Sequence, residues 1–335
     1  MTTTHPITTL APDERWVWVP FDVSKEFDGF RADRFLAGRL AAHSRTKVQH
    51  WLREARVKRG DRWLRANSKV RAGDRIEIAY PRRPEKPLPP DAALPVLFED
   101  DDFLIVDKPA GLLSHPTDKI VTHTVLGVLR KNRTGQAFHL LHRLDRETSG
   151  VLALAKNPRA ARLWSQSMEA RDVHKEYLAL VRGVPSPPSG SMDWPIGRQG
   201  GDIKVRQWIN APGAVAAATT YRIEAVLAND CSLVRAFPRT GRLHQIRVHF
   251  AALGHPLLGD PLYQGDGRVY RKMIAGTVTE EDRATLGFPR AALHAAALEF
   301  PHPVTGGVQR VAASLPADFR TRLAASPGAA PDLLD

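Results

Sequence analysis

The residues best suited to chemistry lie in a polar stretch, residues 142–150, with the sequence HRLDRETSG. The apolar run at 151–155 that follows it is typical of a buried strand, and loops held by buried elements often carry catalytic groups. Asp145 has Arg143 and Arg146 beside it, and nearby cations favour an ionised carboxylate. Asp145 is therefore a candidate nucleophile, base or metal ligand. A salt bridge within the loop would explain the same pattern.

A second basic stretch, residues 239–249, reads RTGRLHQIRVH. The apolar residues Leu243, Ile246, Phe250 and Leu253 recur at helical spacing. This pattern predicts a helix over 243–253. Arg247 borders this stripe, where a guanidinium needs a carboxylate partner because an unpaired buried charge is costly. We expect that partner to be Asp145. The alternative is that Arg247 extends into solvent.

The remaining histidines and the cysteine are better explained by structural roles than by chemistry. His139 and His142 have metal-pair spacing, but no third ligand follows at a usual distance. We expect His244 and His249 to pack and hydrogen-bond within the predicted helix. The single cysteine, Cys231, excludes a disulfide framework and a cysteine-cluster zinc site, and we expect it to be buried.

Length and composition are those of a globular protein with two domains, or with one large domain and an appendage. The chain has 335 residues, of which 43% are hydrophobic and 25% charged. No apolar run approaches the roughly 18 residues of a membrane span. The N-terminal residues lack the basic segment and apolar stretch of a secretory signal. We therefore expect a cytoplasmic protein without membrane association.

The excess positive charge is concentrated in one short segment. The whole chain carries a net charge of +12, and residues 31–83, with sixteen basic and five acidic side chains, hold +11 of it. Such a concentration favours a nucleic-acid-binding module, because neutralising phosphates releases counterions. A solvated basic face is the alternative interpretation.

Periodicity predicts the elements that position these residues. We expect one helix at 35–40 and a second that begins after the capping residue Ser44. Further helices are expected at 124–131, 159–168 and 243–253. We expect strands at 16–19, 75–78, 103–106, 151–155, 176–182, 218–227, 231–237, 294–300 and 308–313. Strands in succession with few helices between them favour an α+β fold with a mostly antiparallel sheet.

The same stretches resemble the signature motifs of the RluA-type pseudouridine synthases. The matches are HRLDxxTSG at 142–150, KxYxAxVxG at 175–183, RTGRxHQIRxH at 239–249, GHPxxGD at 254–260 and DKPxG at 107–111. They occur in the family's order and cover residues 95–315. An ordered set of this kind is far more specific than any single motif.

The basic segment at 31–80 resembles the ribosomal-S-four-like RNA-binding domain that often precedes this catalytic domain. Residues that fit its pattern include Arg31, Asp33, Leu36, Ser44, Gly73 and Ile76. The resemblance implies that basic side chains of this segment contact RNA, namely Arg45, Lys47, Arg53, Lys58 and Arg59.

The resemblance implies isomerisation of a uridine in RNA to pseudouridine, without a cofactor or metal. Asp145 matches the catalytic aspartate, which attacks the sugar, attacks the pyrimidine ring or removes a sugar proton. Tyr177 matches the tyrosine that is expected to stack on the base and to help remove the C5 proton. Arg247 matches the arginine that pairs with the aspartate. Arg143 would enter the RNA stack where the uridine is extruded. Arg242 would contact RNA.

The resemblance also defines a domain plan for a monomer. The segments are an N-terminal extension (1–27), a small α/β RNA-binding domain (28–80), a proline-rich linker (81–92), the catalytic domain (93–323) and a mobile tail (324–335). In the catalytic domain we expect a mostly antiparallel mixed sheet flanked by helices.

The appended basic domain suggests a large structured RNA as partner. Large-subunit ribosomal RNA is the first expectation, and transfer RNA the second. Two competing hypotheses are a non-catalytic RNA-binding or ribosome-assembly protein and a metal-dependent hydrolase acting on RNA.

Overall fold

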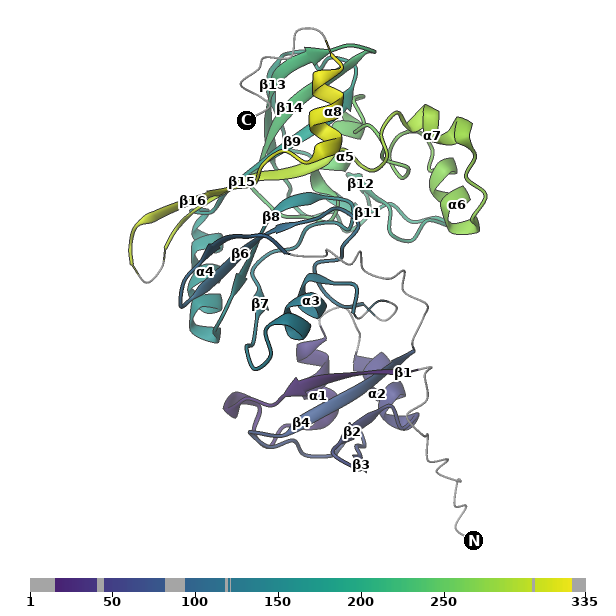
Figure 1. The fold of residues 1–335 in the computed structure, drawn as a ribbon. Coiled ribbons are helices and arrows are strands. Elements are labelled where there is room, and N and C mark those ends of the chain that lie inside the picture. Colours follow the sequence, from purple (N-terminus) through teal and green to yellow (C-terminus); the bar gives the residue numbers. More distant parts are fainter. Residues whose placement is uncertain are drawn as a thin grey trace. The chain divides into compact units, whose positions relative to one another are not determined.

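The computed structural model describes residues 16–40, 45–81, 94–117, 120, 122–302 and 305–326. The chain forms two compact units, drawn in Figure 1. The first comprises Met1–Pro90 and His115–Gly127, and the second Asp91–Ser114 and Val128–Asp335. In the described residues we find no helix with the length and apolar character needed to span a bilayer.

The first unit combines a four-stranded antiparallel sheet with two helices. The strands run in the order β1-β4-β2-β3. Their bounds are β1 (Trp16–Asp22), β2 (Val57–Arg59), β3 (Arg62–Trp63) and β4 (Arg75–Pro81). A 3-10 turn, η1 (Lys25–Phe27), precedes the helices α1 (Ala32–Arg39) and α2 (Arg45–Arg53). Both helices and the strand at 75–78 were predicted from the sequence, and the structure confirms them.

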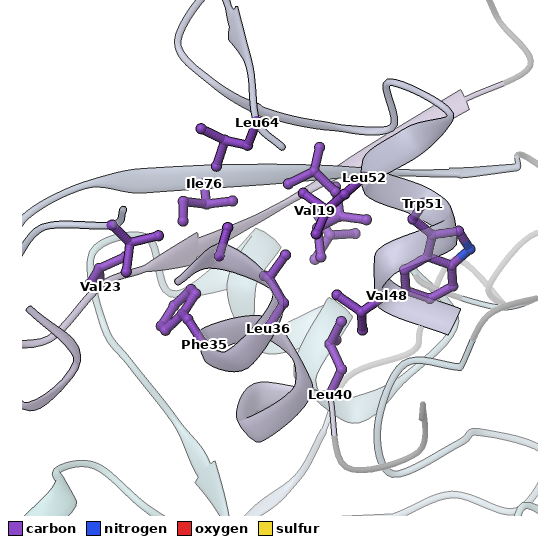
Figure 2. Close-up of a cluster of buried hydrophobic side chains, with 14 residues drawn as sticks. Val19, Val23, Phe35, Leu36, Leu40, Val48, Trp51, Leu52, Leu64 and Ile76 are labelled. Atoms are coloured by element: carbon purple, nitrogen blue, oxygen red, sulfur yellow. The ribbon is translucent and has the colours of Figure 1, made fainter. Parts of the chain in front are cut away.

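One face of this sheet packs against both helices (Figure 2). In β4, Ile76 and Ile78 are completely buried, while Arg75 is exposed, as the alternation of side chains along a strand requires. The helices contribute Ala32, Phe35, Leu36, Val48, Trp51 and Leu52 to the core. Their spacing places these apolar residues on the inner faces of α1 and α2.

The N-terminal boundary differs from the sequence-based expectation. The predicted strand at 16–19 exists, but β1 pairs with β4 along its length, from Trp16 opposite Pro81 to Asp22 opposite Arg75. Because β1 covers an edge of β4 that would otherwise be open, residues 16–27 belong to the domain rather than to an extension. The capping residue Ser44 and residues 82–92 of the predicted linker lie outside the described residues.

The second unit is built on a ten-stranded sheet. Eight strands follow the order β10-β13-β14-β9-β15-β8-β6-β5, while β16 pairs with β15 and β7 with β8. The strands are β5 (Val96–Glu99), β6 (Phe103–Lys108), β7 (His139–Leu140), β8 (Ser149–Ala155), β9 (His174–Arg182), β10 (Ser189–Met192), β13 (Thr219–Leu227), β14 (Cys231–Pro238), β15 (Leu293–Pro301) and β16 (Val308–Ala312). Among the described residues only the β15–β8 pairing is parallel, which confirms the mostly antiparallel α+β prediction.

A small hairpin and several helices complete this unit. The hairpin is β11 (Ile196–Arg198) and β12 (Gln207–Ile209). The helices are α4 (Pro158–Ala170), α5 (Gln245–Ala252), α6 (Arg268–Ala275), α7 (Glu280–Leu286) and α8 (Ala317–Ala324), while α3 (Val125–Asn132) has residues in both units. Ala324, expected in the mobile tail, instead ends α8. Residues 327–335 lie outside the described residues.

Packing on the sheet decides which side chains remain for a site. Leu178 and Leu180 of β9 pack with Phe319 and Leu323 of α8. Side chains alternate along a strand, so Lys175 and Tyr177 project from the opposite face of β9.

Candidate active site

A pocket of about 410 Å³ in the second unit brings the predicted motifs together. It is lined by residues of the β7–β8 loop, of β9 and of the segment that enters α5. The charged and ionisable residues of its lining include Arg143, Asp145, Lys175, Tyr177, Arg242, His244 and Arg247. The stretches at 142–150, 175–183 and 239–249 therefore form one cavity, although they lie far apart in the sequence.

The loop that carries Asp145 is fixed by hydrogen bonds on both sides of that residue. Before it, the buried Ser114 hydroxyl binds both the carbonyl and the N–H of Leu144, at 2.9 and 3.1 Å. After it, the carbonyl of Arg146 accepts from the Gly111 N–H at 2.8 Å and from Lys108 Nζ at 3.2 Å. The backbone thus orients Asp145 toward the pocket.

The predicted ion pair between Asp145 and Arg247 is confirmed. Arg247 Nη1 donates to Asp145 Oδ2 at 2.9 Å, and the two residues are 102 positions apart in the sequence. Arg247 lies on α5 and is 9% exposed, so it does not extend into solvent. Asp145 Oδ1 accepts no hydrogen bond from the described residues, and one carboxylate oxygen is thus left for a substrate.

Asp260 is a second carboxylate partner of Arg247. Its oxygens accept from Arg247 Nε at 2.6 Å and from Nη2 at 2.9 Å. Asp260 ends the sequence motif at 254–260 but was not among the predicted site residues. A signal was present, because the five N–H donors of a buried guanidinium need more acceptors than one carboxylate supplies.

His244 forms a hydrogen bond, as predicted, but it lies at the N-cap of α5 and in the pocket rather than within the helix. Helix α5 begins one residue later, and His244 precedes it in a left-handed conformation with φ of 58°. Its Nδ1 lies 2.9 Å from the Tyr263 hydroxyl, and its Nε2 lies 3.9 Å from Asp145 Oδ2. Leu243, expected in the apolar stripe, is likewise outside the helix and 40% exposed.

His249 behaves as the sequence indicated. It is completely buried in α5, and its ring nitrogens lie 3.0 Å from Thr219 Oγ1 and 3.0 Å from the Trp194 carbonyl. Cys231 is also buried, as expected.

Electrostatics keep Asp145 ionised. Burial alone would raise the pKa of Asp145, but neighbouring positive charge and the hydrogen bond from Arg247 hold it below its usual value. Burial and the charge of Arg247 lower the pKa of His244 to about 4, so His244 is neutral at pH 7. The cation beside Asp145 at neutral pH is therefore Arg247 rather than His244.

Tyr177 presents a neutral ring to the pocket. Burial, together with the negative charge of Asp145, raises its pKa well above the usual value of a phenol. The side chain is 8% exposed, and its hydroxyl has no hydrogen-bond partner among the described residues. A flat, uncharged ring in this position can stack on a planar base.

Two arginines lie at the edge of the pocket. Arg143 is exposed and forms no hydrogen bond or ion pair within the described part of the chain. Arg242 is also exposed, and its Nε donates to the Ala216 carbonyl at 2.9 Å. Gln245 Oε1 accepts from the Arg242 N–H and the Thr240 hydroxyl, at 2.9 and 2.7 Å, which shapes this loop.

The basic residues predicted in the first unit are partly engaged by acidic side chains. Arg45 binds Asp33 at 2.9 Å, Lys58 lies 3.5 Å from Glu77, and Arg59 binds Asp74 at 2.6 Å. Arg53 Nε donates to the Gln49 carbonyl, and Lys47 Nζ lies 6.0 Å from the centre of the Trp51 ring. These contacts engage the side chains within the first unit itself.

We find no cluster of three or more His, Cys, Asp or Glu side chains suited to a metal ion in the ranges that the structure describes. His142 Nε2 accepts the N–H of Ala153 at 3.1 Å. Burial lowers the pKa of His142 to about 3. A neutral histidine with that nitrogen already occupied has a structural role here.

Comparison with known proteins agrees with this geometry. Residues 102–252 match the family model described as RNA pseudouridylate synthase. The chain is 35% identical to the ribosomal large subunit pseudouridine synthase D of Xanthomonas campestris, with 89% of each chain covered. It is 33% identical to the protein of that name from Pseudomonas aeruginosa, over 91% of this chain and 93% of that one.

A solved structure extends the similarity to the fold. Human RNA pseudouridylate synthase domain containing 1 superposes with a TM-score of 0.54 at 29% identity, covering 67% of this chain and 84% of that one.

Proposed function

The chain belongs to the RNA pseudouridylate synthase family, and from this premise we propose that Asp145 drives isomerisation of a base-flipped uridine in large-subunit ribosomal RNA. The ion pair between Asp145 and Arg247 carries this proposal. It keeps an ionised carboxylate at the pocket and leaves Oδ1 open to a substrate atom, as a nucleophile or a base requires.

The reaction breaks the bond between C1′ of the ribose and N1 of the uracil, and then joins C1′ to C5. Three roles for Asp145 fit: its oxygen bonds to C1′, its oxygen bonds to the pyrimidine ring, or it removes a proton from the sugar. The proton on C5 then leaves, and N1 gains one, so the product is an isomer of the substrate.

A uridine inside an RNA stack cannot reach Asp145, so the nucleotide must be extruded into the pocket. The pocket volume of about 410 Å³ lies in the range of roughly 300–1,000 Å³ usual for small-ligand sites. Tyr177 supplies a stacking surface for the extruded base, and Arg143 fills the vacated position. Arg242 contacts the phosphates beside it.

The choice of RNA rests on two observations. The relatives from Xanthomonas campestris and Pseudomonas aeruginosa, at 35% and 33% identity, are named for the large ribosomal subunit, and residues 31–83 hold a net charge of +11. We propose that the first unit acts as a ribosomal-S-four-like RNA-binding domain of a cytoplasmic monomer. Transfer RNA is the second candidate substrate.

Pseudouridine mapping tests this proposal directly. A deletion strain should lack specific pseudouridines in large-subunit ribosomal RNA, and the wild-type gene should restore them while the Asp145→Asn variant should not. Sites lost from transfer RNA alone would indicate the second candidate. Restoration by Asp145→Asn would favour a non-catalytic RNA-binding or assembly protein, and activity lost in EDTA would favour a metal-dependent enzyme.

A further inference from the structure

Lys175 carries a buried charge for which the described residues provide no partner. It lies on β9, two residues before Tyr177, and is 8% exposed. Its ammonium group forms no hydrogen bond or ion pair with any described residue. By contrast, the buried Lys108 donates to three backbone carbonyls, and the buried Arg290 binds Asp318.

The ammonium group of Lys175 lies in the wall of the catalytic pocket. Both Lys175 and Tyr177 line this cavity. A Cβ atom placed on Gly241 would lie 3.7 Å from Lys175 Nζ, which fixes the group beside the loop that leads to α5. Residues i and i+2 of a strand are about 6–7 Å apart on the same face. The Lys175 side chain therefore leaves the same face of β9 as the ring proposed to stack on the base, and both line the same cavity.

An ammonium group that is largely withdrawn from water, faces a pocket and has no protein partner is unfavourable in the free protein. Burial lowers the pKa of Lys175, which expresses the same cost. Lys175 does not form an ion pair with Asp145, although both line the pocket. A charge held at such a cost beside a substrate position is best explained by a partner that arrives with the substrate.

We propose that Lys175 is a catalytic residue that stabilises the negative charge developing on the uracil ring. This inference rests on the proposed isomerisation. When the C1′–N1 bond breaks, its electron pair remains on the uracil, spread over N1 and the two carbonyl oxygens. If Asp145 adds to the pyrimidine ring instead, an electron pair likewise moves onto the ring oxygens. The charge disappears when C5 has bonded to C1′, C5 has lost its proton and N1 has gained one.

The position of Lys175 favours the ring over a backbone phosphate. Arg143 and Arg242 are exposed at the edge of the pocket, where the proposed function places the RNA backbone, and they can bind its phosphates. Lys175 is buried in the wall next to Tyr177. A fixed positive charge in a water-poor site stabilises developing negative charge much more strongly than one in water.

The test varies the stability of the uracil anion. Full-length Lys175→Met and wild-type proteins are compared in single-turnover reactions on an RNA oligonucleotide with uridine or 5-fluorouridine at the mapped target position. The readout is loss of the starting nucleotide, because 5-fluorouridine has no C5 proton and cannot complete the isomerisation. Fluorine stabilises negative charge on the ring, so 5-fluorouridine should depend less on Lys175. The rate on uridine should fall on the order of a hundredfold, the loss on 5-fluorouridine should be clearly smaller, and RNA affinity should not change.

Two controls separate the alternatives. Lys204→Met removes an exposed lysine of the same unit and should keep wild-type rates. The melting temperature of Lys175→Met should not fall, because the variant removes an uncompensated buried charge. Equal losses on both substrates, or weaker binding without a slower reaction, would overturn the role of Lys175. An inactive wild-type protein would instead contradict the proposed function, and this inference with it.

Discussion

Asp260 holds Arg247 more firmly than Asp145 does. Two guanidinium nitrogens donate to the two oxygens of Asp260, at 2.6 and 2.9 Å, whereas a single nitrogen reaches Asp145. Asp260 is completely buried and also accepts the backbone N–H groups of Leu262 and Tyr263. Asp260 therefore positions Arg247, and Arg247 in turn positions Asp145.

Removing Asp260 should consequently destabilise the protein and slow the reaction. We expect Asp260→Ala to lower the free energy of unfolding by about 3–5 kcal/mol, because the buried charge of Arg247 loses its main partner. Urea denaturation measures this. Asp202→Ala is the matched control, since Asp202 binds Arg271 with similar geometry at an exposed site and should change stability little. Equal effects of the two substitutions would contradict the role of Asp260.

Asp145→Asn should abolish isomerisation while the fold survives. The substitution is nearly isosteric, but it removes the charge and the nucleophilic oxygen. Pseudouridine formation on the target RNA measures activity, and circular dichroism with thermal melting reports the fold. Turnover within about tenfold of wild type would contradict the assignment, because loss of the essential group should cost far more.

Local chemistry made much of the site predictable from the sequence. Asp145 lies in a polar loop before a strongly apolar strand, and Arg247 borders the buried side of a helix, so their pairing followed from the cost of an isolated buried charge. Tyr177 came from the family motif alone. The position of His244 could not be read in this way, because helical periodicity continues through Leu243 while the helix itself begins at Gln245.

The sequence predicts which segments form strands better than it predicts the order of those strands in the sheet. Strand β15 lies between β8 and β9, although more than a hundred residues separate it from either in sequence, and no local pattern encodes that pairing. Helices α6 and α7 were not predicted. The contact of Tyr263 with His244 depends on the fold of the chain after α5 and had no local signal.

Stability should fall as the pH is lowered from about 6.5 to about 4. Burial lowers the pKa of His142 to about 3 and those of His244 and His294 to about 4, from an ordinary value of 6.5. In this window the unfolded chain binds protons that the folded chain excludes, so acidification favours unfolding. The lowered pKa of Asp145 affects stability only at pH values below about 3.8, the ordinary pKa of an aspartate, and therefore outside this window. Urea midpoints measured across this pH range test the prediction.

His294→Gln provides the specific check of that pH dependence. The variant removes one of the buried titrating groups, so its urea midpoint should fall less steeply between pH 6.5 and 4 than that of the wild type. A wild-type midpoint that stays constant over this window would show that these histidines do not couple protonation to folding.

The exposed basic residues of the first unit should supply RNA affinity rather than chemistry. Arg53, Arg62 and Arg65 are exposed, and their replacement by glutamine should weaken RNA binding while the single-turnover rate at saturation changes less. The slope of log K against log salt should become shallower by roughly 0.7–0.9 for each phosphate that the variant no longer neutralises.

The matched control for this charge-reduced variant removes the same charge from the second unit. Arg159, Arg162 and Arg283 are also exposed, and their triple glutamine variant should keep the wild-type salt slope because we expect these side chains to bind no phosphates. Affinity measured across a salt series and single-turnover rates separate the two effects. Identical salt slopes for both triple variants would mean that the basic side chains of residues 31–83 do not neutralise phosphates. A first-unit variant that binds normally but fails to react would place chemistry, rather than affinity, in that segment.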